Sequence, residues 1–168
     1  ILNQLKQDTS KKDLQNFKTN FKCKNISHLI AELFYISANA LSTQSLFSLS
    51  NYYINLAKHL NPNFFSYDSL LAENYLISKN FTKAKEVYTG MNKIGEIYKW
   101  HSNKQISIIL EKENVGNKKK SISLVRSTYN NLSKPNLYQT FDYANFLRNN
   151  ELFEDSINYY SKIIIKIN

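Results

Sequence analysis

The side chains best suited to chemistry in this sequence are three histidines and one cysteine. His28, His59 and His101 are far apart, and no two of them stand at the spacing of a shared metal site. Cys23 lies between two lysines, which would favour its thiolate form if the side chain were exposed. It has no second cysteine and no evident base beside it. The sequence therefore predicts neither a metal centre nor a cysteine nucleophile.

Phosphate-binding loops and paired carboxylates are not indicated either. The three glycines are isolated, so the chain offers no Gly-rich loop to cradle a phosphate group. The acidic residues are of the kind common on helix surfaces, and their spacing marks no two of them as a catalytic pair. We therefore expect a protein that is not an enzyme and that holds no cofactor and no metal. These acidic residues include Glu73, Glu96, Glu111 and Glu113.

The composition indicates a folded, helix-rich protein. Of the 168 residues 42% are apolar and 14% are aromatic, which is too much for a disordered chain. Only three Gly and two Pro occur, which favours long helices over many strands and turns. No apolar run approaches the ~18 residues that a membrane-spanning helix needs. We therefore expect no transmembrane segment, and the compartment is left open.

Similar residues return along the chain at two fixed intervals. Phe47 recurs as Phe81 and again as Phe153, and the second interval is about twice the first, which leaves room for one more unit. Self-similarity at a period of about 34 residues is typical of helical repeat arrays, in which short amphipathic helices bury their apolar sides against one another. Two further series have the same intervals: Ser50, Ala84 and Ser156, and Ala38, Ala72 and Ala144.

The apolar periodicity predicts an all-α chain of about four helix-turn-helix units forming one continuous solenoid over residues 29–168. Residues 1–28 are interpreted as the end of a preceding repeat and a connector. The third unit is the least regular, with a looser joint before it. The predicted units are 31–64, 65–98, 102–136 and 137–168.

These residues resemble the tetratricopeptide repeat family, whose repeat of ~34 residues consists of two antiparallel helices. The family prefers a small residue at the eighth place of the repeat, matched by Ala38, Ala72 and Ala144. It also prefers Ala or Ser at the twentieth place and aromatic residues at the seventeenth and twenty-fourth. The third unit departs, with Ile109 at its eighth place. The spacing is also similar to that of large bacterial proteins of this family that have no assigned role.

The resemblance implies a right-handed superhelix that binds a peptide or partner protein on its concave face and has no catalytic activity. That face would be lined by the first helix of each unit. The alternative for each lining residue, packing against the next repeat, stays open. The implied partner-binding residues are Tyr35, Asn39, Ser66, Ser69, Glu73, Ile106, Leu110, Tyr138, Phe141, Asn145 and Arg148.

The net charge of +9 raises a second hypothesis, binding of nucleic acid or an anionic surface. In the family, however, the positions of these lysines face the convex side or the turns, where charge is usually solvated. We therefore favour protein binding over nucleic-acid binding. The lysines concerned are Lys79, Lys83, Lys85, Lys118, Lys119, Lys120, Lys162 and Lys166.

The last predicted helix is apolar at its end. Terminal repeats of an array normally carry a polar outer face, whereas this helix ends in a cluster of isoleucines, Ile163 to Ile167. We therefore expect this cluster to pack on a further helix and the chain to be part of a longer repeat-containing protein.

Overall fold

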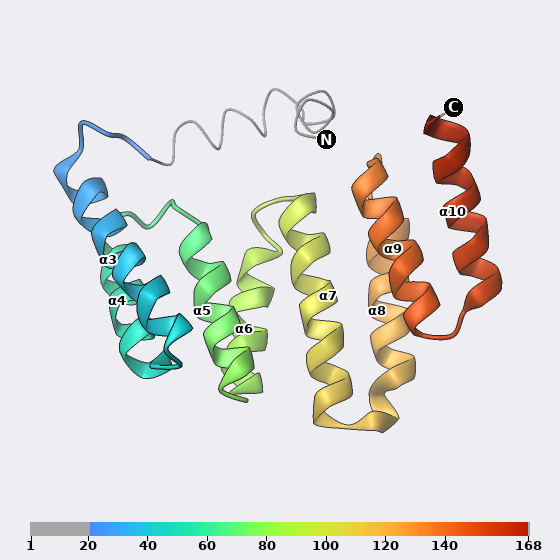
Figure 1. The fold of residues 1–168 in the computed structure, drawn as a ribbon, viewed down its shortest axis with the longest axis horizontal. Coiled ribbons are helices and arrows are strands. Elements are labelled where there is room, and N and C mark those ends of the chain that lie inside the picture. The colour runs from blue at the N-terminus through green and yellow to red at the C-terminus, as the bar shows by residue number, and fades with distance from the viewer. Residues whose placement is uncertain (1–20, 168) are drawn as a thin grey trace. The chain divides into compact units, whose positions relative to one another are not determined.

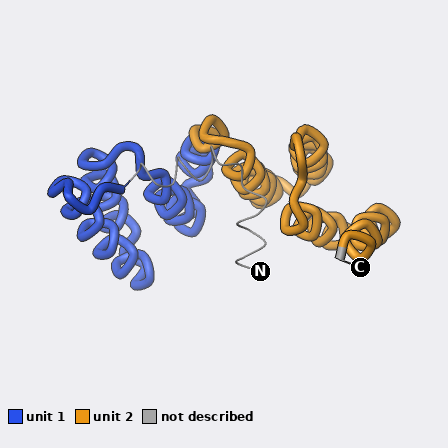
Figure 2. Tube along the Cα trace, turned by 90° about the horizontal axis from the view of Figure 1, so that it is seen from above, with its two compact units in different colours: residues 1–88 blue, residues 89–168 orange. Residues whose placement is uncertain are grey.

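The computed structural model describes residues 21–167, and every element in that part of the chain is a helix. The chain divides into two compact units, Ile1–Tyr88 and Thr89–Asn168 (Figure 2). The all-α prediction is confirmed for the described residues. The predicted end of a preceding repeat falls on residues 1–20, which lie outside them.

Unit 1 is built from helices that follow one another through short turns (Figure 1). Helix α3 begins after Asn25, whose side-chain oxygen accepts a 2.9 Å hydrogen bond from the backbone nitrogen of Ser27. This bond satisfies one of the backbone donors that a helix start leaves unpaired. The helices are α3 (Ile26–Thr43), α4 (Phe47–Leu60), α5 (Ser66–Ile77) and α6 (Phe81–Met91), and the division between the units falls within α6.

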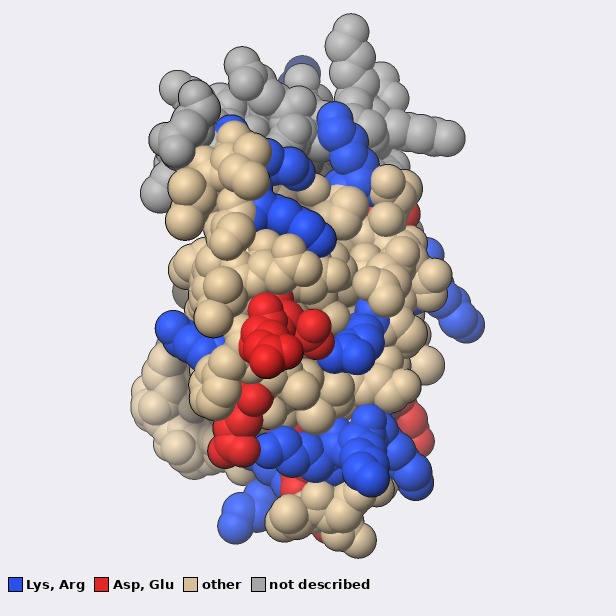
Figure 3. All heavy atoms as spheres, turned by 90° about the vertical axis from the view of Figure 1, so that its right-hand side faces the viewer, with Lys and Arg blue, Asp and Glu red and all other residues tan. Residues whose placement is uncertain are grey.

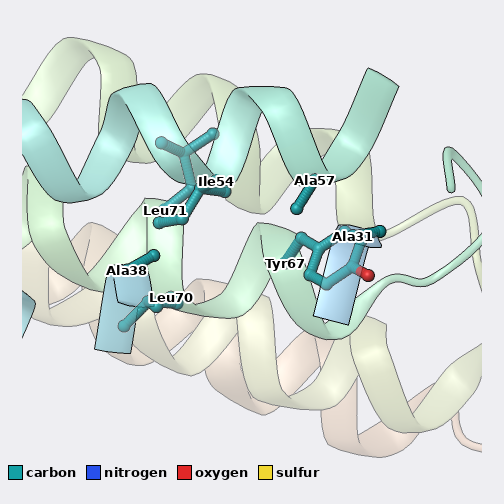
Figure 4. Packing of buried hydrophobic residues seen from close by; sticks show 7 residues of the cluster. All are labelled: Ala31, Ala38, Ile54, Ala57, Tyr67, Leu70 and Leu71. Atoms are coloured by element: carbon teal, nitrogen blue, oxygen red, sulfur yellow. The ribbon is translucent and has the colours of Figure 1, made fainter. Parts of the chain in front are cut away.

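The core of unit 1 lies where α3, α4 and α5 meet (Figure 4). Ala38 from α3 and Ala57 from α4 are fully buried, and their small side chains let neighbouring helices approach closely. Ile54 and Tyr67, also fully buried, fill the space between α4 and α5. The buried cluster consists of Ala31, Ala38, Ile54, Ala57, Tyr67, Leu70 and Leu71.

Unit 2 contains two helix pairs. Its first helix begins at Glu96, directly after Gly95, so it is longer at its start than the predicted unit that begins at residue 102. Glu96 lies in the first turn, where a negative charge interacts favourably with the helix dipole. A short 3-10 helix, η1 (Val115–Asn117), joins the first pair. The helices are α7 (Glu96–Glu113), α8 (Lys118–Asn130), α9 (Leu137–Asn149) and α10 (Phe153–Ile167).

The core of unit 2 is aromatic. Tyr129 of α8 and Tyr143 of α9 stack with ring centroids 4.1 Å apart and an interplanar angle of 13°. Trp100 of α7 and Tyr159 of α10 each meet both of these rings edge to face or nearly so. Such contacts add to the free energy gained by burying the rings. All four helices of the unit therefore contribute to one cluster.

Three of the helix pairs share one turn. Ser45, Lys79 and Glu151 have φ angles of 60°, 61° and 65°, and each lies two residues before the second helix of its pair. In each turn the next residue donates its backbone N–H to the carbonyl five residues earlier, as in Schellman motifs. The third pair has η1 instead. The repeat seen in the sequence is thus also a repeat of backbone conformation, with the same irregular member.

Candidate partner-binding surface

Four of the predicted partner-binding residues lie along one side of α9. Tyr138, Phe141, Asn145 and Arg148 follow one another at intervals of three or four residues, which places them on one face of a helix. The side chains of Tyr138 and Phe141 are 65% and 50% exposed, and Arg148 is exposed. We call these four residues the α9 surface. They combine two accessible aromatic rings, one amide and one cation.

The rest of α9 fixes the orientation of this surface. Asn136 accepts a 2.8 Å hydrogen bond from the backbone nitrogen of Gln139, and the Gln139 side chain accepts one from the Asn136 backbone nitrogen at 3.0 Å. This capping box sets the start of the helix. The opposite face is buried in unit 2, so α9 cannot rotate without exposing its apolar side. Its buried residues are Gln139, Thr140, Tyr143, Ala144 and Leu147.

A residue of α10 supports the α9 surface. The hydroxyl of Tyr160 donates a 2.7 Å hydrogen bond to the side-chain oxygen of Asn145, and its ring centroid lies 6.0 Å from that of Phe141. Asn145 is therefore held with its carbonyl oxygen occupied and its amide N–H₂ group available as a donor. The surface is ordered before any partner binds, which lowers the entropy lost on binding.

Helix α7 is attached to α9 by a carboxylate. The indole Nε1 of Trp100 donates a 2.8 Å hydrogen bond to Asp142, and the ammonium group of Lys104 pairs with the same carboxylate. The Trp100 side chain is 3% exposed, so its N–H needs this acceptor. The predicted residues Ile106 and Leu110 lie further along α7 and are half-buried.

In unit 1 the structure brings Tyr35 against α5. Its hydroxyl is 3.5 Å from the backbone oxygen of Ser66, and its ring centroid is 5.0 Å from that of Tyr67. The Asn39 amide donates a 2.8 Å bond to the backbone oxygen of Tyr35, within the same helix. These contacts are those of a packing residue, the alternative that the sequence left open. Tyr35 therefore offers less surface to a partner than the α9 aromatics do.

The remaining predicted residues of unit 1 are on α5. Ser66 and Ser69 are half-buried, whereas Glu73 is exposed. Burial, with a smaller effect from the Glu73 carboxylate, raises the pKa of Tyr88 to about 12. Tyr88 therefore stays neutral at physiological pH. Of Ser66, Ser69 and Glu73, only Glu73 has an acidic side chain.

The lysines of the second hypothesis are spread over both units. All of them are exposed except Lys85, which is half-buried. Two lie over aromatic rings of their own unit: Lys83 is 5.5 Å from the ring centroid of Tyr75, and Lys162 is 4.5 Å from that of Tyr159. On the face drawn in Figure 3, Lys and Arg gather in separate groups with acidic side chains between them.

The described residues contain no group of three or more His, Cys, Asp or Glu side chains that could hold a metal ion. Cys23 is exposed and carries a free thiol. Among the helices of residues 21–167, none is both long and apolar enough to cross a bilayer.

The sequence did not indicate how the α9 surface is supported. The hydrogen bond from Tyr160 to Asn145 spans 15 residues. No sequence pattern indicated that Asp142 joins two helices, because its partners Trp100 and Lys104 are 42 and 38 residues away. Contacts at such separations depend on how the helix pairs stack, which a single sequence does not reveal.

No family model matches this chain, and no curated protein matches it either. The assignment of a function therefore rests on the chain's own residues.

Proposed function

We propose that this protein is a tetratricopeptide-like repeat array that acts as a protein-interaction scaffold. The repeated turn at Ser45, Lys79 and Glu151 and the small residues at the predicted helix contacts support this proposal. In this account the helix pairs coil into a right-handed superhelix, and the first helix of each pair faces the partner. The protein binds and positions a partner and catalyses no reaction.

The observation that carries the proposal is the exposure of Tyr138 and Phe141 on a helix that is otherwise well packed. Exposed aromatic residues next to an Arg are the side chains that most often dominate the free energy of protein association. Water contact with these rings is unfavourable, and a partner that covers them removes it. Preordering by Tyr160 adds to the effect, since fewer rotamers are lost on binding.

The chemistry of the α9 surface suggests what binds there. Two rings favour apolar side chains, the free amide donor of Asn145 favours a carbonyl oxygen, and Arg148 favours a carboxylate. An extended or helical protein segment with apolar residues near an acidic one has these groups at suitable intervals. The second hypothesis, nucleic acid on the basic surface, has no comparable site in its support.

The proposal is tested by capture from native lysate, with and without nuclease treatment, at ~150 mM salt so that long-range attraction is screened. The wild type is compared with a Tyr138→Ala/Phe141→Ala double variant and with Tyr52→Ala as a control. Tyr52 is an exposed aromatic on α4, 59% accessible, and is not among the predicted binding residues. All three must have equal helical content by circular dichroism.

We expect a protein partner that is lost with the double variant and kept with Tyr52→Ala. Equal capture by all three proteins would contradict the proposal. Material that disappears on nuclease treatment in every case would favour the nucleic-acid hypothesis instead.

A further inference from the structure

One face of α4 packs against α5. The faces of α10 and α3 can be compared with this reference contact, because they occupy corresponding positions in their helix pairs. Lys58 of α4 forms an ion pair with Asp68 of α5, and the Asn51 side chain accepts a 2.8 Å hydrogen bond from Asn74. Between these two polar pairs lies Ile54, which is fully buried against α5. The contact is therefore an apolar centre with a polar pair at each end.

The corresponding face of α10 is open and apolar. The shared turns align α4 with α10, so that Ile157 occupies the place of Asn51 and Ile164 that of Lys58. Ile157 is 64% exposed and Ile164 is 60% exposed, and Tyr160 lies between them. Both polar end positions of the reference face have become isoleucine. A face of this kind is costly to leave in water.

The face of α3 that corresponds to the buried face of α5 is also open. Leu33 occupies the place of Tyr67, and Ile36 that of Leu70. In α5 these positions are 0% and 9% exposed, whereas Leu33 and Ile36 are 63% and 58% exposed. Helix α3 thus presents the apolar surface that α5 buries, without a helix of the described chain against it.

The two open faces match at the ends of the reference contact. At its centre (Figure 4) Tyr160 takes the place of Ile54 and Ser37 that of Leu71. If α10 packs on α3 as α4 packs on α5, Ile164 meets Phe34 where the reference contact has its ion pair. Likewise Ile157 meets Ala40 where the reference contact has its pair of amides. Both partners of both polar pairs have been replaced by apolar residues, so neither face leaves a buried charge or amide unpaired. If only one residue of each pair were apolar, the contact would bury a charge or an amide without its partner.

We propose that α10 of one copy docks on α3 of a second copy, in the manner in which α4 docks on α5 within the chain. The contact joins two different surfaces, so a pair of copies keeps one free α3 face, on one copy, and one free α10 face, on the other. Such a heterologous interface adds further copies until a ring closes, or grows into an open filament. The association is driven by apolar burial.

The experiment is sedimentation velocity of the chain from about 1 µM to about 100 µM, since association by mass action depends on concentration. One variant, Ile157→Asn/Ile164→Lys, gives α10 the polar residues of α4. A second, Leu33→Glu/Ile36→Glu, places charge on the α3 face. Val115→Glu is the control, because Val115 is 83% exposed and belongs to neither face. Circular dichroism checks that each variant keeps its helical content.

We expect the wild type and Val115→Glu to form oligomers that grow with concentration, and each double variant alone to stay monomeric. A mixture of the two double variants should form a one-to-one dimer and nothing larger, because only one intact α10 face and one intact α3 face remain. A wild type that is monomeric throughout overturns the proposal. So does an α3 variant that still dimerises alone, since that indicates contact between identical α10 faces.

Discussion

The hydroxyl of Ser156 donates a 2.9 Å hydrogen bond to the backbone carbonyl oxygen of Ala144. Ser50 donates the same bond, at 2.8 Å, to Ala38 in the other unit. All four residues are buried. A small side chain at each place lets the two helices of a pair approach closely, and the hydroxyl then reaches across to the neighbouring backbone. The bond therefore fixes the second helix of the pair against the first.

Removal of these hydroxyls should destabilise the two units unequally. Ser156→Ala should lower the free energy of unfolding by about 1 kcal/mol, the usual net value of one buried hydrogen bond. Ser50→Ala should cost about 2 kcal/mol, because the Asn74 amide donates a 2.8 Å bond to Ser50 and would lose a buried acceptor. Ser127→Ala is the control, since Ser127 is exposed and bonds only within its own helix. Urea unfolding followed by circular dichroism measures all three, and a cost equal to that of the control would contradict the role given to the bond.

The turn before α10 should be improved by glycine. Glu151 has a φ of 65°, a backbone conformation that disfavours residues with a side chain, and glycine adopts it without steric cost. Glu151→Gly should therefore raise the free energy of unfolding by about 0.5 to 1 kcal/mol. Fluorescence of Trp100, the single tryptophan, reports on unit 2 during urea unfolding. Glu151→Ala is the matched control and should bring no gain, because alanine keeps the steric cost. Equal effects of the two substitutions would argue against relief of strain.

The carboxylate that joins α7 to α9 should matter more than an exposed one. Asp142→Ala leaves the buried Trp100 indole without its acceptor and Lys104 without its partner, so we expect a loss of about 2 kcal/mol. Asp155→Ala breaks an exposed 2.7 Å pair with Arg126 and should cost about 0.5 kcal/mol or less. Unfolding followed by circular dichroism compares the two, and similar costs would show that Asp142 is not a structural anchor.

Stability should fall at alkaline pH through buried tyrosines. Burial, with smaller effects from Glu32 and Tyr35, raises the pKa of Tyr67 to about 12 in the folded protein, against about 10 when unfolded. The folded state therefore keeps a proton that the unfolded state releases. This contribution is complete below pH ~10 and is lost between pH ~10 and ~12, at up to about 1.4 kcal/mol per pH unit. Tyr67→Phe should flatten the fall, whereas Tyr52→Phe, at an exposed position, should not. An unchanged slope in Tyr67→Phe would be inconsistent with a raised pKa.

The fold class could be predicted from the sequence because its signals are local. Apolar residues at helical spacing and the recurrence of Phe47, Phe81 and Phe153 depend on neighbouring positions only, and they gave the helix pairs and the irregular third unit. The early start of α7 at Glu96 was missed, because residues up to 98 were assigned to the second unit and a looser joint was placed before residue 102.

The candidate site was only partly predictable. The positions of Tyr138 and Phe141 followed from the repeat pattern, but their exposure depends on what packs beside α9. For Tyr35 the same pattern indicated a partner-facing residue, whereas its ring lies against Tyr67. The position of a residue in the repeat therefore predicts which side of its helix it lies on. Only the three-dimensional contacts show whether a neighbouring helix already covers that side.

The most direct test of the proposed function is photo-crosslinking from the α9 surface itself. A photoreactive phenylalanine analogue at position 141, in native lysate treated with nuclease, should join the chain to a discrete protein. The same analogue at position 52 should not, since Tyr52 is equally accessible but lies outside the surface. Addition of Arg148→Ala to the position-141 protein should weaken the product. Products of the same kind from both positions, or none from position 141, would contradict a partner-binding role for the α9 surface.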